Sequence, residues 1–335
     1  MKALLYGAYG YTAQLILEYA DQLPWQWVLA GRQEEPLKLL AEKYQCEYRV
    51  FDLNDHETLC NALEEVQWVL HCAGPFVHTA KQMMTACIEK GVHYSDITGE
   101  FEVFEWAADF SEKARDAGVM LLPGCGFDVV PTDLVAKALA EKLPEADELW
   151  LAFSGGGGMS KGTLKSAFNK LGKAGKERIH HELKDVPIGY KHLRFSWNGK
   201  TYKGLSIPWG DVFTAWYSTG IPNITTFMLM KSGIRVLPVL LRLVKPLLKV
   251  KAIKAQILNN ILQKVGEGPA KNELEEKRSL VWGRVVKGAV SYEALLRGPH
   301  AYKLTALSCL AIGKRIFRGD CKAGFQTPTL AYGLS

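Results

Sequence analysis

Two apolar runs and the glycine-rich turn between them, LLYGAYGYTAQLIL at residues 4–17, constrain this fold more than any other stretch. The first run has the length of a buried strand, and the second has apolar residues at helical spacing. The turn, Gly7–Ala13, either cradles a phosphate at the start of the helix or is a tight structural connection. In both cases the stretch predicts a strand followed by a helix that packs on it.

The same alternation continues to about residue 125. Apolar runs of strand length are separated by segments with helical spacing, a pattern typical of βαβ units and a parallel sheet. The predicted strands are Ala3–Tyr6, Trp27–Ala30, Tyr48–Phe51, Trp68–Cys72, Tyr94–Ile97 and Val119–Leu122. Helices are predicted to start near Tyr11, Glu35, Asp55, Thr79 and Phe101, the last running to Ala117. We therefore expect an α/β fold with a Rossmann-like, doubly wound parallel sheet.

The pattern changes after Pro131. A helix is predicted over Pro131–Leu143, with the proline in its first turn. Strands are predicted at Glu148–Ser154, Tyr190–Trp197, Lys200–Ile207, Phe213–Ser218, Ile224–Met230, Leu280–Val286 and Val290–Leu296. Asn198-Gly199 is a strong signal for a type I′ hairpin between two of them. The second half is therefore expected to be an α+β domain with a mostly antiparallel sheet.

Charge also divides the chain. Residues 1–150 contain 11 Lys and Arg against 25 Asp and Glu, a net charge of −14, and residues 151–335 contain 30 against 10, a net charge of +20. The second half therefore faces an anion, such as cofactor phosphates, an acidic substrate or a membrane surface, or the two halves attract each other. Nucleic acid is not an expected partner, because no zinc finger, RNP signature or basic zipper accompanies the positive charge.

The seven cysteines form no CxxC pair and are odd in number. Such usage is typical of reduced thiols in a cytoplasmic chain and predicts neither a disulfide framework nor a metal site. The apolar residues after Lys2 run straight into Gly7 and Gly10, so no signal peptide is expected. We therefore expect a cytoplasmic protein.

Residues 234–265 contain no Asp or Glu, seven Lys and Arg, and many Leu, Val and Ile. Pro238 and Pro246 interrupt this segment, which is too short and too charged to span a bilayer. It either forms a basic amphipathic helix that lies on a membrane or lines a lipid pocket, or it docks on the sheet with a solvated basic face. The first alternative predicts peripheral membrane contact.

If the first turn binds a dinucleotide, the backbone N–H groups at the start of the helix face its diphosphate. In that case Gly7 allows the tight turn, Gly10 the close approach of the phosphates, and Ala13 the contact between helix and strand. The position of this turn, after a buried strand and before an amphipathic helix, favours the phosphate-binding interpretation.

The end of the second predicted strand, Gly31-Arg32, bears on the choice of cofactor. A Rossmann unit that binds NAD has a carboxylate there for the ribose 2′-hydroxyl, whereas a guanidinium grips a 2′-phosphate. Arg32 therefore favours NADP(H) over NAD(H). The alternative is a surface arginine paired with Glu34 or Glu35.

Two further segments follow strand ends. Asp52-Leu53, after the third strand, is expected beside the adenine. Ala73, Gly74, Pro75 and Phe76 follow the fourth strand, where a Rossmann chain passes the nicotinamide, and they are small and stiff enough for a ring to lie against. His71, within that strand, is interpreted as a core histidine.

Together these residues resemble the saccharopine dehydrogenase-like oxidoreductases, in particular the trans-acting enoyl reductase branch. The resemblance covers nearly the whole chain and rests on GAYGYTAQL, LAGR, CAGPF, GVHYSDITGE (Gly91–Glu100), PGCGFDVVPTDL (Pro123–Leu134), STGIPN (Ser218–Asn223) and YKLTA (Tyr302–Ala306). It implies an NADP-binding Rossmann domain at residues 1–130, completed by about 300–335 through a helix near Tyr302–Phe317. A substrate-binding or dimerisation α+β domain is then expected at residues 131–299. The antiparallel strands predicted in it offer a surface for a homodimer, but the sequence does not fix the oligomeric state.

The resemblance also implies site residues. Those expected at the cofactor are Gly7, Gly10, Tyr11, Thr12, Arg32 and the Ala73–Phe76 loop. Thr98, Gly99 and Glu100 follow the fifth strand, and Cys125–Asp128 follow the sixth. Because open α/β sheets bind ligands at the carboxyl ends of their strands, these groups are expected at one edge.

The expected reaction is hydride transfer from NADPH to an activated C=C or C=O of a lipid-like or acyl substrate. No tyrosine is followed four residues later by a lysine, which excludes the short-chain dehydrogenase pair. The candidate proton donors are Lys161, Tyr302, Cys125, Glu100 and Asp128. Lys161 is the best placed of them, because it follows the glycine-rich backbone of Gly155–Gly158.

Two alternatives stay open. A saccharopine-type C–N oxidoreductase acting on an amino acid needs several arginines that converge on two carboxylates, whereas the arginines of the second half are scattered. A non-catalytic NADP-binding protein at a lipid surface needs only an intact cofactor turn.

Overall fold

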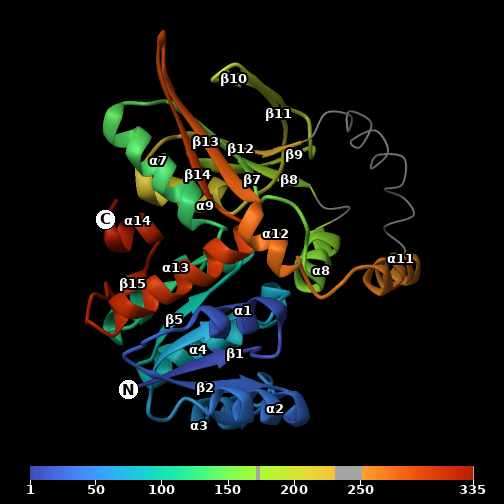
Figure 1. The fold of residues 1–335 in the computed structure, drawn as a ribbon. Coiled ribbons are helices and arrows are strands. Elements are labelled where there is room, and N and C mark those ends of the chain that lie inside the picture. Colours follow the sequence, from blue (N-terminus) through green and yellow to red (C-terminus); the bar gives the residue numbers. More distant parts are fainter. Residues whose placement is uncertain (171–173, 231–250, 335) are drawn as a thin grey trace. The chain divides into compact units, whose positions relative to one another are not determined.

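A computed structural model of the chain describes residues 1–170, 174–230 and 251–334. The chain divides into two compact units (Figure 1). Unit 1 consists of Met1–Leu134 and Ala301–Ser335, and unit 2 of Val135–His300. Each unit is described by itself below.

A parallel sheet forms the centre of unit 1. In the described part of the chain its strand order is β15-β6-β5-β4-β1-β2-β3, and every neighbouring pair is parallel. The strands are β1 (Lys2–Tyr6), β2 (Gln26–Gly31), β3 (Glu47–Val50), β4 (Val66–His71), β5 (His93–Asp96), β6 (Met120–Leu122) and β15 (Gly324–Phe325). The order reverses at β1, which has β2 on one side and β4 on the other, so the predicted doubly wound topology is confirmed.

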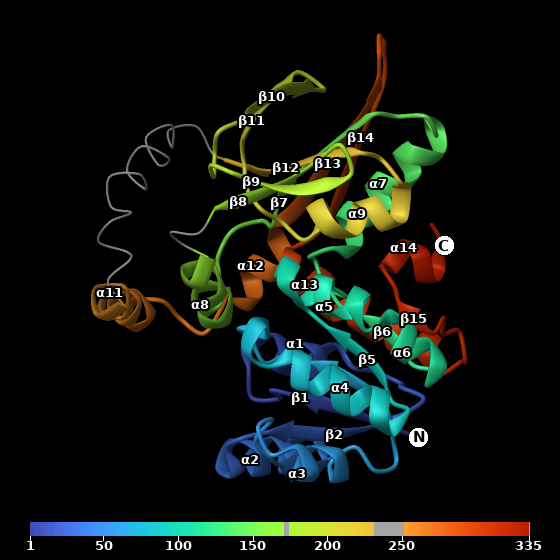
Figure 2. The same ribbon diagram turned by 180° about the vertical axis from the view of Figure 1, so that it is seen from behind.

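Helices cover both faces of this sheet. They are α1 (Tyr11–Tyr19), α2 (Glu34–Tyr44), α3 (His56–Asn61), η1 (Phe76–His78), α4 (Ala80–Lys90), α5 (Phe101–Asp109), α6 (Ser111–Asp116), α13 (Ala301–Ile316) and α14 (Pro328–Tyr332). Figure 1 shows α13 alongside α1, and Figure 2, the view from behind, shows α4, α5 and α6 on the opposite face. The single helix predicted over residues 101–117 is in fact two helices, which meet at Phe110.

The helix α13 completes unit 1, as expected for a C-terminal helix. Its Gly313 lies against the rings of Trp25 and Trp68, so close that a Cβ at this position would be within 2.8 Å of both. Trp25 stacks on Phe317 with ring centroids 4.9 Å apart, and Trp68 is fully buried beneath them. This aromatic contact fixes α13 on the sheet, because large rings bury much apolar area.

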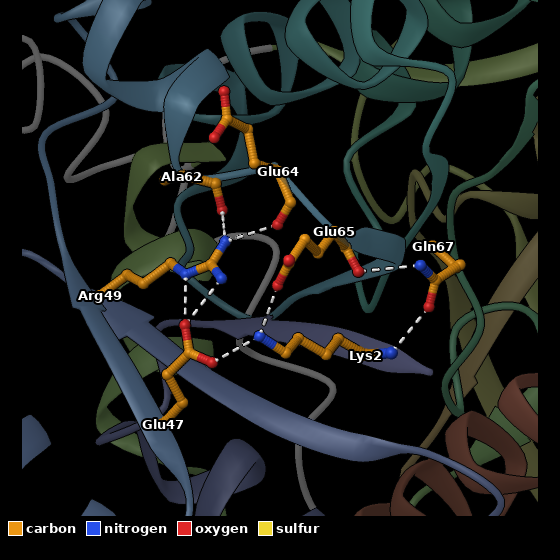
Figure 3. A network of polar contacts seen from close by, with 7 residues as sticks. All are labelled: Lys2, Glu47, Arg49, Ala62, Glu64, Glu65 and Gln67. Atoms are coloured by element: carbon orange, nitrogen blue, oxygen red, sulfur yellow. Dashed lines mark hydrogen bonds and ion pairs between the residues drawn. The ribbon is translucent and has the colours of Figure 1, made fainter.

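Charged side chains join the strands at the edge where they begin (Figure 3). The Lys2 ammonium lies 2.8 Å from carboxylate oxygens of both Glu47 and Glu65. The Arg49 guanidinium pairs with Glu47 and donates to the carbonyl oxygen of Ala62 at 2.7 Å. This network ties the starts of β1, β3 and β4 together, so the edge where the strands begin is closed by its own side chains.

Unit 2 is built on a curved, mixed sheet. Its described strands are β7 (Glu148–Ser154), β8 (Gly175–Ile179), β9 (Glu182–Val186), β10 (His192–Trp197), β11 (Lys200–Ser206), β12 (Asn223–Leu229), β13 (Arg278–Lys287) and β14 (Val290–Pro299). The main order is β10-β11-β12-β7-β13-β14, with β8 pairing β12 and β9. Only the β12–β7 pair among these is parallel, which confirms the mostly antiparallel sheet. The described helices of this unit are α7 (Val130–Lys142, which starts in unit 1), α8 (Lys161–Lys170), α9 (Asp211–Thr219), α11 (Lys251–Lys264) and α12 (Lys271–Glu276).

The core of this sheet is aromatic. The ring of Phe195 on β10 stacks on that of Trp282 on β13, with centroids 4.3 Å apart, although three strands separate β10 from β13. The sheet must therefore curl, and the small side chain of Ala152 on β7 is fully buried in the same cluster. The predicted hairpin between β10 and β11 is confirmed, with positive φ at both Asn198 and Gly199.

One predicted strand is wrong. Residues 213–218 belong to the helix α9, which starts at Asp211 and ends at a left-handed Gly220. Six of the nine residues of this helix are buried, including the consecutive Val212 and Phe213, so it is buried on most of its surface. A short apolar run does not distinguish a strand from a buried helix, which explains the error.

The prediction for residues 234–265 falls largely outside the described residues, which resume at the start of α11. The docked and membrane-bound alternatives for this segment, and the homodimer, stay predictions. Every helix in the described residues is too short or too polar to cross a lipid bilayer.

Candidate functional site

The glycine-rich turn lies at the carboxyl end of β1. Gly7 has φ +82°, and its N–H donates to the carbonyl oxygen of Ala30 at 2.8 Å. A Cβ at Gly7 would lie 2.9 Å from the Cβ of Ala73, in the loop that follows β4. The turn thus requires glycine for its backbone angle and for its close approach to the next loop. The Gly10 N–H donates to the Gly7 carbonyl at 2.9 Å and brings the chain into α1.

The start of α1 is suited to an anion. Gly10 is the N-cap residue and supplies no side-chain cap, and the first turn contains no acidic residue. N–H groups in the first turn of a helix have no acceptor within it, and they lie at the positive end of the dipole. The N–H groups of Thr12 and Ala13 are therefore suited to an anion such as a phosphate. The Tyr11 ring packs edge-on against Tyr302 of α13, with centroids 5.3 Å apart.

Arg32 lies at the end of β2, next to this turn. Its side chain is exposed and makes no hydrogen bond or ion pair with any described residue, so the predicted alternative of pairing with Glu34 or Glu35 is not seen. Burial raises the pKa of Tyr6, and the nearby Arg32 guanidinium opposes that rise, which locates Arg32 close to the end of β1. An unpaired guanidinium beside a helix start is the group expected to hold a 2′-phosphate.

Sequence analysis missed Tyr9, which is one of the unassigned positions of the turn. Its ring lies on the α-carbon of Gly31, where a Cβ would be 2.7 Å from Cε1. Its carbonyl oxygen accepts a hydrogen bond from the Gln14 side chain at 2.9 Å. Asp52, expected beside the adenine, is exposed and accepts hydrogen bonds from Asn54, while Leu53 is buried. Tyr9 and Gly31 therefore form an aromatic surface next to Arg32.

The loop after β4 lies against the turn through Ala73. Ala73, Gly74 and Pro75 are partly or fully exposed, whereas Phe76 is buried and packs edge-on against His71. The Thr79 hydroxyl donates to the Ala73 carbonyl at 2.8 Å and holds the loop. This arrangement leaves a small, accessible backbone surface next to Gly7.

Below this loop lies a buried polar chain that sequence analysis did not find, except for Thr98. The Tyr94 hydroxyl donates to Asp96 Oδ2 at 2.7 Å and lies 3.3 Å from His71 Nδ1. Asp96 Oδ1 accepts from the N–H groups of Thr98 and Gly124, each at 2.9 Å. Burial lowers the pKa of His71 to about 3, so this histidine is neutral and belongs to the core, as interpreted.

The pKa of Asp96 predicts a pH effect on stability. Burial raises this pKa from 3.8 to about 6 in the folded protein. The folded state therefore binds the proton more tightly than the unfolded state, and the resulting stabilisation is lost as pH rises from 3.8 to about 6. In urea unfolding, the Asp96→Asn variant should gain about 3 kcal/mol relative to wild type between about pH 4 and pH 7. A difference that does not change with pH would contradict this, and the exposed Asp109→Asn is the control.

Asp96 also brings the two later loops together. The Cys125 N–H donates to the Asp96 carbonyl at 2.8 Å, so the loop after β6 is joined to the end of β5. The Asp128 carboxylate lies directly on the α-carbon of Gly99. The Phe127 N–H donates to the Thr305 hydroxyl of α13 at 2.9 Å. The expected meeting of these loops at the carboxyl edge of the sheet is therefore present in unit 1.

The candidate proton donors of unit 1 have different surroundings. Cys125 is fully buried, and its sulfur lies 3.4 Å from that of Cys309. Glu100 is 3 % exposed and accepts a hydrogen bond from the Val77 N–H. Asp128 is 9 % exposed, and Tyr302 is partly exposed beside Tyr11. Among these candidates, Tyr302 combines partial exposure with a contact to Tyr11 at the start of α1.

Lys161 belongs to unit 2, as the first residue of α8. Its ammonium lies 2.6 Å from Glu267 Oε1, and its side chain is 35 % exposed. The preceding Gly155–Gly158 segment has positive φ at its last three residues, and the Gly157 carbonyl lies 2.7 Å from the Nε2 atom of His300. The backbone before Lys161 is therefore fixed within unit 2.

Comparisons with known proteins agree with this geometry. The family model for the saccharopine dehydrogenase NADP-binding domain matches residues 3–122. The saccharopine dehydrogenase-like oxidoreductase of Homo sapiens is 29% identical over 239 residues, which cover 61% of this chain and 55% of that protein. A trans-acting enoyl reductase of Mycobacterium ulcerans is 28% identical over 150 residues, covering 42% of this chain and 36% of that protein. The chain thus spans about half the length of the first relative and about a third of the second.

The fold has a solved counterpart. The apo saccharopine dehydrogenase (L-Glu forming) of Saccharomyces cerevisiae superposes with a TM-score of 0.65, covering 99% of this chain and 96% of that one. At 11% sequence identity this likeness shows a shared fold alone. Residues 3–122 are therefore similar to the saccharopine dehydrogenase NADP-binding domain, and the chain as a whole is similar to saccharopine dehydrogenase-like oxidoreductases.

Proposed function

We propose that the chain is an NADPH-dependent reductase that acts on an activated C=C or C=O of a lipid-like or acyl substrate. The observation that carries this proposal is the edge of unit 1 where the uncapped start of α1, the Gly7 turn and the unpaired Arg32 lie together. Bound NADPH supplies a hydride there. The chain itself must hold the cofactor, orient the acceptor and provide a proton.

Each part of the cofactor has a matching group in unit 1. The N–H groups at the start of α1 suit the diphosphate, and the exposed Arg32 suits the 2′-phosphate. The Tyr9 ring over Gly31 offers a flat surface beside Arg32 for the adenine. The Ala73–Phe76 loop, which touches Gly7, suits the nicotinamide end.

The acceptor class is inferred from unit 2. Several of its arginines are already engaged with their own unit: Arg178 and Arg278 donate to backbone carbonyls, and Arg284 pairs with Glu293. These side chains are therefore not available to bind the two carboxylates of an amino diacid. The relative named as an enoyl reductase supports the alternative, an activated double bond on an acyl group.

Lys161 is the proton donor that we favour. It is a partly exposed cation at the start of α8, and a single exposed carboxylate, Glu267, holds it. The backbone N–H of Lys161 donates to the Glu267 carbonyl at 3.3 Å, so both the backbone and the side chain of the lysine are bound to Glu267. Tyr302 is the second candidate, because it contacts Tyr11 in the cofactor turn.

We expect Lys161→Met to lower kcat about 100-fold, the lower end of the usual contribution of a general acid, without changing NADPH affinity. Lys165→Met is the matched control, because Lys165 is an exposed lysine one turn further along α8. Steady-state NADPH oxidation gives kcat, and NADPH fluorescence titration gives the affinity. Equal activities of the two variants would exclude Lys161 as the donor.

The reaction class is tested with substrates rather than variants. Purified protein and NADPH are assayed against an α,β-unsaturated acyl thioester, a long-chain ketone, and an amino acid mixed with an aldehyde. Oxidation of NADPH with the thioester or the ketone supports the proposal. Oxidation only with the amine and aldehyde together would establish the C–N oxidoreductase instead, and NADPH binding without any turnover would establish the non-catalytic alternative.

A further inference from the structure

Three side chains that the proposed function does not use converge on one point of unit 1. His56 and Cys60 are four residues apart on α3, and Glu89 lies near the end of α4. Their ligand atoms all lie within 4.8 Å of one another. His56 Nε2 is 2.8 Å from Glu89 Oε2, and the Cys60 sulfur is 3.6 Å from His56 Nε2 and 3.7 Å from Glu89 Oε2.

We propose that His56, Cys60 and Glu89 form a Zn²⁺ site that ties α3 to α4. Zinc binds imidazole nitrogen and carboxylate oxygen at about 2.0–2.2 Å and thiolate sulfur at about 2.3 Å, in tetrahedral geometry. Ligands at those distances are about 3.6 Å apart when one is sulfur and about 3.4 Å apart otherwise. The two distances to the sulfur already match, and only the contact between His56 and Glu89 must widen, by about 0.6 Å.

The geometry distinguishes a metal site from a catalytic relay. In a Cys–His–Glu relay the thiol and the carboxylate contact opposite nitrogens of the imidazole ring. Here the Cys60 sulfur and the Glu89 oxygen both lie next to the same atom, His56 Nε2. Three ligand atoms that converge on one point match a metal centre, with water as the fourth ligand.

The surroundings hold the ligands in place but leave them accessible. Asp55 caps α3 by accepting from the Thr58 N–H and hydroxyl, and Leu59 anchors the helix in the core. The side chains of His56 and Glu89 are 54 % and 49 % exposed, so an ion reaches them from solvent. Imidazole and thiolate ligands select zinc over magnesium or calcium, which prefer oxygen.

The site also predicts a pH dependence of metal binding. On coordination the thiol gives its proton to solvent and the sulfur binds the metal, so affinity should increase as pH rises. The sequence does not show this site, because Glu89 lies on a second helix and no local motif contains all three ligands.

The test uses the whole chain, reduced and stripped with a chelator, and Co²⁺ as a spectroscopic probe. We expect one equivalent of Co²⁺ to give a sulfur-to-cobalt charge-transfer band and the visible absorption of a tetrahedral ion, both abolished by one equivalent of Zn²⁺. Cys60→Ser should remove the charge-transfer band. His56→Ala and Glu89→Gln should weaken binding at least about 10-fold, as the loss of even an outer-shell partner does.

Cys46→Ser is the matched control, because Cys46 is another partly buried thiol of unit 1 and should keep the full band. Circular dichroism and NADPH titration show whether each variant is folded. The site is disproved if folded wild-type protein gives no band at one equivalent. It is also disproved if Cys60→Ser keeps the band, or if Cys46→Ser removes it.

Discussion

Gly7→Val is expected to weaken NADPH binding about 1000-fold. Valine at φ +82° costs about 1–2 kcal/mol from the backbone alone. Its Cβ would also meet the Cβ, Cα and N atoms of Ala73 at 2.9–3.1 Å, and such overpacking costs about 1–3 kcal/mol more. To relieve the backbone strain and the overlap with Ala73, the turn must move away from β4. The N–H groups at the start of α1 then no longer face the diphosphate. NADPH fluorescence titration measures the loss.

Gly91→Ala is the control that tests whether backbone strain at a glycine is enough to weaken NADPH binding. Gly91 has φ +68°, close to that of Gly7, but a Cβ there would have nothing within 4 Å. It follows α4 rather than β1. We expect this variant to lose about 1–2 kcal/mol of unfolding free energy in urea and to bind NADPH normally. If Gly91→Ala lost the cofactor as well, general destabilisation would explain both results, and the turn would have no special role.

Arg32→Glu is expected to reverse the cofactor preference. A charge-assisted hydrogen bond contributes about 1.5–3 kcal/mol, so Arg32→Ala should weaken NADPH binding about 10- to 100-fold. Glutamate adds repulsion of the 2′-phosphate and should weaken it about 1000-fold. NADH, which lacks that phosphate, should bind the variants about as well as wild type. The ratio of the two affinities isolates the phosphate contact from any change in the fold.

Lys38→Ala is the control for long-range charge. Lys38 is an exposed cation on α2, the helix that follows Arg32. We expect it to leave the NADPH to NADH ratio unchanged, and we expect added salt to weaken wild-type NADPH binding more than NADH binding. An Arg32→Ala protein with the wild-type ratio would show that the 2′-phosphate is held elsewhere.

Much of the fold of unit 1 could be predicted from the sequence, because its local sequence patterns agree with its tertiary structure. The central strands β1, β2 and β4 contain apolar runs of the right length, and Gly91 and Gly118 end their helices in the left-handed region, as glycine favours. The positions of Gly7, Gly10 and Arg32 in the fold could be predicted for a similar reason, because each stands at a fixed place relative to a predicted strand; their role at the cofactor stays a prediction. The break at Phe110 was not found, because apolar spacing continues through it.

The hairpin of β8 and β9 shows why the fold of unit 2 was harder to predict from the sequence. Its strands are polar and charged, and its turn has positive φ at His180 and His181 rather than at an Asn-Gly pair. Distant contacts hold that turn: the Asn223 side chain accepts from the His180 N–H, and the His181 N–H donates to the Pro222 carbonyl. Such contacts join residues far apart in sequence, so no local sequence pattern predicts them.

The buried polar chain of unit 1 was missed for a related reason. Tyr94 and Asp96 lie within a short strand whose sequence reads as an ordinary apolar and polar mixture. Their importance comes from partners at Gly124 and His71, which become neighbours only when β4, β5 and β6 align. The site at His56, Cys60 and Glu89 likewise exists only once α3 and α4 lie side by side.

The packing of α13 on Trp25 and Trp68 has a consequence for folding during synthesis. Translation produces Trp25 and Trp68 early, but Gly313 and Phe317, which cover them, emerge only after all of unit 2. Until then the nascent sheet keeps an uncovered hydrophobic surface, and its edge strand β6 lacks its partner β15. We therefore expect the region that is synthesised first to reach its native state only after unit 2 has been made, with its apolar surface exposed to aggregation until then.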